Sequence, residues 1–128
     1  RITCVSQVEI SVGSIAYTKG TSEVTSLIVN NLAATQDLEA FNVQREFNDG
    51  SVENKQATVS LIAGASLDIA SVPNVVLNFN DPVGTQAMKN IHVSPIFTQT
   101  TSDGGSCRIV CSEQKKTVPF TDPRVLLT

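Results

Sequence analysis

Residues 41–62 read FNVQREFNDGSVENKQATVSLI, and this stretch decides the fold. Apolar and polar side chains alternate with period two on both sides of its centre, which is typical of half-buried β-strands. The central Asn48-Asp49-Gly50 supplies residues that tolerate the left-handed backbone angles of a tight turn. Phe41–Phe47 and Ser51–Ile62 are therefore predicted to pair as a β-hairpin.

The same alternation recurs along most of the chain, in short runs spaced at about the 8–12 residues expected of a β-sandwich. Val, Ile and Thr are abundant, and their branched side chains suit a pleated sheet. Helical character is confined to residues 33–40, where a single turn is expected. No linker or repeat divides the 128 residues. The sequence predicts one all-β domain over residues 1–128, an antiparallel sandwich of the Ig-like or jelly-roll type with about eight or nine short strands.

The predicted core consists of the apolar side chains on the inward faces of these runs. A further strand is expected at Val75–Phe79, followed by a turn at Asn80-Asp81-Pro82. The residues expected to lead the core are Val8, Ile10, Val24, Ile28, Phe41, Val43, Val59, Leu61, Leu67, Ile69, Val75, Leu77, Phe79, Val93, Ile109 and Phe120.

The charge and hydropathy patterns argue against two classes of partner. Charged residues make up only 16% of the chain, the net charge is −3, and the basic residues are scattered except for Lys115-Lys116. A nucleic-acid partner is therefore not expected. No run approaches the ~18 consecutive apolar residues of a membrane helix, so membrane insertion is not expected either.

The sequence offers little for catalysis or metal binding. His92 is the one histidine, so a Ser or Cys nucleophile has no other imidazole as its base, and its apolar neighbours predict that it lies on the exposed face of a strand. Asn78, Asn80 and Asp81 carry oxygens that suit calcium, but a capped turn before Pro82 explains the same residues. We predict no enzymatic activity, no metal site and no cofactor.

Three cysteines, Cys4, Cys107 and Cys111, lie near the two ends of the chain and are the disulfide candidates. If Arg108–Val110 is extended, Cys107 and Cys111 are about 13 Å apart, beyond the ~7 Å that a disulfide spans. One of them could bond Cys4 if the first and last strands are neighbours, and the odd cysteine could then bond another subunit. Three buried thiols, or one bridge and one buried thiol, are the alternatives.

The longest alternating segment is Ile2–Val12, and we expect it to form an extended N-terminal strand that contacts another subunit. A strand of this kind can add to an open sheet edge of a second copy, although pairing within its own sheet is the commoner outcome. The residues expected on its apolar side are Ile2, Cys4, Val8, Ile10 and Val12.

A resemblance supports a role at the cell surface. Val24–Asn31, the turn Asn48-Asp49-Gly50, and Ser60–Ile69 with its internal glycine resemble Ig-like domains of prokaryotic surface and appendage proteins. The resemblance implies an Ig-like sandwich and leans toward a surface role. Cysteines near the chain ends that join successive subunits are similar to the arrangement in bacterial spore-appendage fibres, at a different spacing.

These features favour a structural function. The preferred prediction is a self-assembling subunit of an extracellular filament or surface layer, which polymerises through its N-terminal strand. One alternative is a recognition or adhesion module that binds glycan or protein through the loops Asp81–Lys89 and Thr100–Ser106. Another is a viral coat or decoration protein. All three place the protein outside the cell, on a cell surface or on a virion surface.

Overall fold

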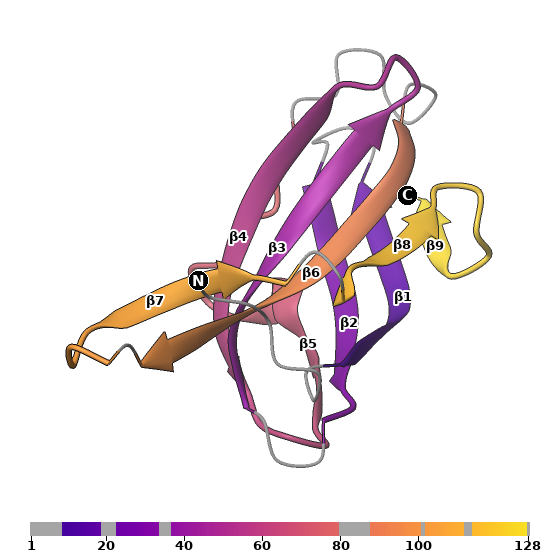
Figure 1. Ribbon diagram of the computed structural model, residues 1–128. Coiled ribbons are helices and arrows are strands. Elements are labelled where there is room, and N and C mark those ends of the chain that lie inside the picture. Colours follow the sequence, from indigo (N-terminus) through magenta and orange to yellow (C-terminus); the bar gives the residue numbers. More distant parts are fainter. Residues whose placement is uncertain are drawn as a thin grey trace.

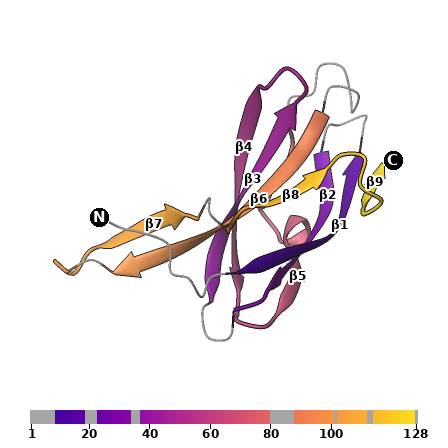
Figure 2. The same ribbon diagram turned by 45° about the vertical axis from the view of Figure 1, so that its right-hand side comes forward.

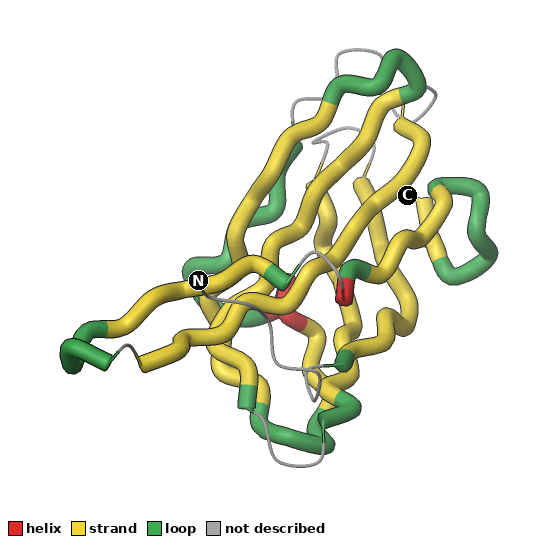
Figure 3. Tube along the Cα trace, in the orientation of Figure 1, coloured by secondary structure: helices red, strands yellow, loops and turns green. Residues whose placement is uncertain are grey.

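The computed structural model describes residues 9–18, 23–33, 37–79, 88–100, 102–111 and 114–127. Almost all regular structure in these ranges is strand, and helix is confined to short turns (Figure 3). A 3₁₀ turn at Ile69–Ser71 follows the fifth strand directly. The strands are β1 (Ile10–Thr18), β2 (Glu23–Asn31), β3 (Leu38–Phe47), β4 (Val52–Leu61), β5 (Ser66–Asp68), β6 (Met88–Thr100), β7 (Ser106–Val110), β8 (Lys116–Pro119) and β9 (Val125–Leu127).

The strands form two sheets that face each other (Figures 1 and 2). The four-stranded sheet has the order β5-β2-β1-β9, and the five-stranded sheet has the order β4-β3-β6-β7, with β8 also paired to β6. Among the described strands all pairs are antiparallel except β1 with β9, which is parallel. The predicted all-β sandwich of eight or nine strands is therefore confirmed.

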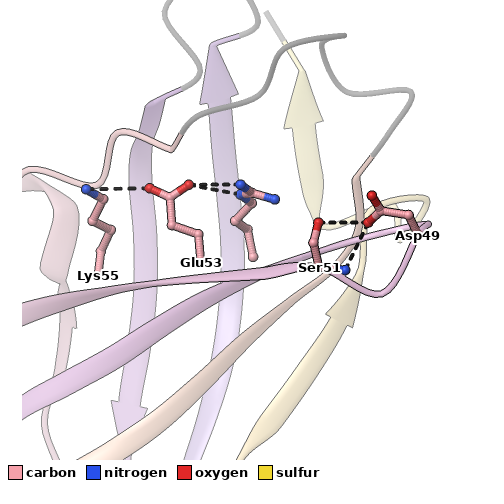
Figure 4. Close-up of polar contacts among 5 residues, drawn as sticks. Asp49, Ser51, Glu53 and Lys55 are labelled. Carbon is pink, nitrogen blue, oxygen red and sulfur yellow. Dashed lines mark hydrogen bonds and ion pairs between the residues drawn. The ribbon is translucent and has the colours of Figure 1, made fainter.

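The predicted hairpin is confirmed as β3 and β4. Gly50 takes a φ of 89° at the turn, and its N–H donates to the Phe47 carbonyl at 3.0 Å. The Asp49 carboxylate accepts the Ser51 N–H at 2.9 Å and the Ser51 hydroxyl at 2.7 Å (Figure 4). These bonds, the backbone one first, lower the pKa of Asp49 below its ordinary value of 3.8. The turn is thus closed by local bonds that the Asn48-Asp49-Gly50 sequence encodes.

The core lies between the sheets and contains most of the predicted residues. Ile28, Leu67 and Val75 are only half-buried, and Val8 and the side chain of Ile109 lie outside the described residues. The predicted residues that are buried are Ile10, Val24, Phe41, Val43, Val59, Leu61, Ile69, Leu77, Phe79, Val93 and Phe120. Tyr17 was not predicted, yet it is fully buried and meets the Phe120 ring edge-on, with centroids 5.2 Å apart.

The prediction of Ile28 as a core residue was wrong, because the register of β2 shifts within the strand. Opposite the neighbouring residues Ala16 and Tyr17 of β1 lie Ser26 and Val24, so Thr25 is an extra residue on β2. Such a bulge exchanges the two faces of the strand that follows it. Leu27 and Val29 are therefore buried instead.

Two local predictions also need correction. Val75–Phe79 is not a strand; its pairing is limited to one bridge, Asn78 with Glu23, beside the bond from the Val24 N–H to the Leu77 carbonyl. The helical turn predicted for residues 33–40 does not include residues 38–40, because β3 begins at Leu38. Residues 34–36 lie outside the described ranges.

Candidate functional site

The described part of the predicted assembly strand is a core strand of its own sheet. Ile10 and Val12 are buried and pair with Asn31 and Val29 of β2 in the same chain. Ile2, Cys4 and Val8 lie outside the described residues. A subunit contact through the residues before Glu9 stays a prediction.

Of the three predicted cysteines, Cys111 and the backbone of Cys107 lie within the described residues. Cys111 follows β7, is fully buried and forms a disulfide. Cys107 is on β7, opposite Gln99 of β6, in the hairpin that projects from the sandwich (Figures 1 and 2). Cys4 lies outside the described residues, as do Asn80 and Asp81 of the calcium alternative. No group of three or more His, Cys, Asp or Glu residues that could hold a metal occurs within the described ranges.

The prediction that His92 is exposed was wrong, since the residue is only 7% exposed. Its Nε2 lies 2.8 Å from the Glu46 carboxylate of β3, and its Nδ1 lies 2.7 Å from the Thr117 hydroxyl of β8. Asn90 donates to the same Glu46 oxygen at 2.9 Å. The Asn90 bond first, and then the His92 bond, lower the pKa of Glu46 below its ordinary value of 4.5.

This His92 cluster connects three strands across the polar face of the five-stranded sheet. Both imidazole nitrogens are used, one toward β3 and one toward β8. A carboxylate, an imidazole and a hydroxyl in a row are also the components of a hydrolytic triad. The bonds that we observe hold β8 against the sheet, and the absence of catalysis stays a prediction that substitution of His92 tests.

The strand β4 presents the longest open sheet edge in the described part of the chain. It is the end strand of its sheet, with β3 on one side and no described strand on the other. It has ten residues, against three each in β5 and β9, four in β8 and five in β7. Short edge strands are one way in which proteins avoid association, and β4 lacks this protection.

The backbone groups on the open side of β4 can be assigned from the turn. The Phe47 N–H donates to the Ser51 carbonyl at 2.9 Å, and bonding alternates along an antiparallel pair. Glu53, Lys55 and Ala57 therefore turn their N–H and C=O groups toward β3. The residues between them turn these groups outward, and they are Val52, Asn54, Gln56 and Thr58.

The side chains of β4 differ between its two faces. On the outer face, the Asn54 side-chain oxygen accepts from Asn42 at 2.9 Å and from Gln44 at 3.0 Å. On the inner face, the Glu53 carboxylate lies between Lys55 at 3.6 Å and the Arg45 guanidinium at 2.9 Å (Figure 4). Further along, the inner face is apolar and buried. An added strand would thus meet polar groups outside, and charges followed by apolar groups inside.

A hollow of about 510 Å³ lies at one end of the sandwich. Its apolar lining comes from Met88, Phe120 and Leu127, and Lys89 and Asn90 contribute polar groups. The remaining lining residues are Asn48, Pro119 and Thr121. Its volume falls in the range of about 300–1,000 Å³ that is usual for small-ligand sites.

Comparisons with known proteins identify no relative. No protein-family model, no curated protein and no solved structure matches the chain. Within the described ranges no helix is long and apolar enough to span a membrane.

Proposed function

We propose that the protein is a structural subunit that self-assembles into an extracellular filament or surface layer, and that the β4 edge is one of its contacts. The observation that carries the proposal is the ten-residue open edge of β4. An extended strand that joins such an edge gains main-chain hydrogen bonds along its whole length. The low charge and the sequence resemblance to surface proteins add support for the location.

A second copy of β4 is the occupant that the charges favour. An antiparallel pair centred on Asn54 opposes the outward groups of Asn54 in both copies. It also places Glu53 opposite Lys55 of the partner subunit, and opposite charges across an antiparallel pair are stabilising. The same residue of each copy contacts the other, so this contact is two-fold symmetric.

The strength of this contact is limited. Each main-chain hydrogen bond contributes about 0.5–1.5 kcal/mol net, and association itself costs at least about 4 kcal/mol. A pair of edges alone therefore binds weakly. A two-fold pair also closes on itself, so a filament or layer requires a second contact, for which the N-terminal segment before Glu9 is the candidate. Repetition of both contacts along an assembly then raises the overall affinity.

The substitution Gln56→Pro tests the β4 contact. Proline removes an outward N–H and leaves the bonds to β3 intact, and edge strands tolerate proline in this position. We expect the variant to fold like the wild type and to form no filament or layer by size-exclusion chromatography and electron microscopy, where the wild type assembles. Gln56→Ala keeps the N–H and is the matched control, which should assemble. Assembly of Gln56→Pro at wild-type concentration would show that β4 is not the contact.

A recognition module is the second candidate function, and the hollow beside Leu127 favours it. Its apolar floor and the nearby Lys89 suit a small ligand with a polar or anionic group. A glycan and peptide array, probed with the Gln56→Pro protein, tests this candidate. Binding that is lost in Leu127→Arg would favour recognition over assembly.

A further inference from the structure

The disulfide of Cys111 has two possible partners, because the chain contains only two other cysteines, Cys4 and Cys107. The backbone around β7 distinguishes between them. This distinction concerns covalent connectivity and does not depend on the proposed function.

The geometry of β7 excludes Cys107 as the partner. Its pairing with β6 runs without a register shift from Ser106 opposite Thr100 to Val110 opposite Ile96. The Cys111 N–H continues this pairing, since it donates to the Pro95 carbonyl at 2.8 Å. Four extended residues at ~3.3 Å each separate the two Cα atoms by about 13 Å, whereas a disulfide spans at most about 7 Å.

We infer that Cys111 is bonded to Cys4 within the chain and that Cys107 is the cysteine outside this bond. The bond links Cys4 to the buried residue that directly follows β7. Two of the three cysteines then form the bridge, and the third is a thiol on the projecting hairpin.

Formation of this bond requires an oxidant. The two thiols lose two protons and two electrons, which a low-molecular-weight disulfide such as oxidised glutathione accepts as it becomes two thiols. Bonds of this kind persist in oxidising surroundings and are rare in the reducing cytosol. The inferred connectivity therefore agrees with a location outside the cell.

Trypsin separates the three cysteines and makes the inference testable. Cleavage at Arg1, Lys19, Lys89, Arg108 and Lys115 places Cys4 in residues 2–19, Cys107 in residues 90–108 and Cys111 in residues 109–115. The full chain is oxidised with oxidised glutathione, alkylated, and run on a non-reducing gel, and the monomer band is digested for mass spectrometry. We expect residues 2–19 linked to residues 109–115, with residues 90–108 alkylated or carrying glutathione.

Two variants complete the test. Cys107→Ser should keep the linked pair, whereas Cys4→Ser should leave Cys111 open to alkylation. Reduction should lower the melting temperature of the wild type and of Cys107→Ser, and leave that of Cys4→Ser unchanged. A link between residues 90–108 and 109–115, or a 2–19 link found only in multimer bands, would overturn the inference. Neither result depends on the β4 edge, so this inference and the proposed function can fail separately.

Discussion

The strands β4 and β8 lie at opposite edges of the same sheet, where β4 pairs with β3 and β8 pairs with β6. β4 has ten residues and turns Val52, Asn54, Gln56 and Thr58 outward. β8 has only four residues. The alternation of its backbone bonds and its one proline determine which hydrogen-bonding groups it turns away from β6.

The Phe120 N–H donates to the Lys89 carbonyl at 2.9 Å, so the alternation turns Thr117 and Pro119 of β8 outward. Because proline has no N–H, Pro119 offers no donor on this edge. β8 is thus short and poor in donors, whereas β4 is long and rich in them. Association through this sheet is therefore expected at the β4 edge rather than at the β8 edge.

The largest effect is expected when proline replaces Ala57, the residue of β4 that follows Gln56. The Ala57 N–H points toward β3, and its side chain is fully buried. Ala57→Pro should therefore lower the free energy of unfolding by about 3 kcal/mol or more, measured by chemical denaturation. Gln56→Pro, its neighbour, should lose far less. If the two variants are equally destabilised, the assignment of inward and outward groups on β4 is incorrect.

The next largest effect is expected at the buried end of β4. Leu61 is 2% exposed, so Leu61→Ala should lower the free energy of unfolding by about 2–5 kcal/mol. Ile28→Ala is the control on the other sheet, and it should lose less because Ile28 is only half-buried. A greater loss at Ile28 would mean that the bulge in β2 does not turn this residue outward.

The comparison also shows what the sequence could predict. The hairpin of β3 and β4 was predictable because its turn is encoded locally in Asn48-Asp49-Gly50, with alternating strands on both sides. Strand order is set by contacts between distant segments, so the position of β4 at an edge could not be read from its own residues. The same limit applies to Ile28, whose face depends on one extra residue, Thr25, in a register that only pairing with β1 reveals.

The candidate site shows the same limit more strongly. His92 was predicted to be exposed because its neighbours in sequence are apolar. Its partners, Glu46 and Thr117, come from two other strands, and no local pattern indicates that they lie on either side of the imidazole. The one available signal was period two, which correctly assigned His92 to the face opposite Ile91.

A smaller effect is expected when the hydrogen bonds between His92 and its partners on β3 and β8 are removed. His92→Ala deletes both bonds of the imidazole and leaves the partner groups to solvent or to each other. We expect a loss of about 1–3 kcal/mol in the free energy of unfolding, with assembly through β4 unchanged. Thr117→Val removes only one of the two bonds and should lose less. If His92→Ala abolishes a hydrolytic activity of the wild type, the hydroxyl, imidazole and carboxylate are catalytic and the structural assignment of His92 is incorrect.

The smallest effect is a dependence of stability on pH. It involves two carboxyl groups, Glu46 in the His92 cluster and Asp49 in the turn before β4. The hydrogen bonds from Asn90 and then from His92 lower the pKa of Glu46 in the folded protein. A carboxyl with a lowered pKa stabilises the fold above its ordinary value of 4.5, and this contribution is lost as the pH falls through the folded pKa. The midpoint of urea unfolding should therefore decrease as the pH falls below the ordinary value of 4.5, and the decrease should be smaller in Glu46→Gln. Asp49, at the turn before β4, also has a lowered pKa, from its bonds to Ser51. Asp49→Asn should flatten the same profile by a separate amount, because Asp49 and Glu46 share no hydrogen-bond partner among the bonds described, so the double variant should show the sum of the two effects. A double variant no flatter than Glu46→Gln alone would mean that the turn of β4 contributes nothing to the acid sensitivity of the fold.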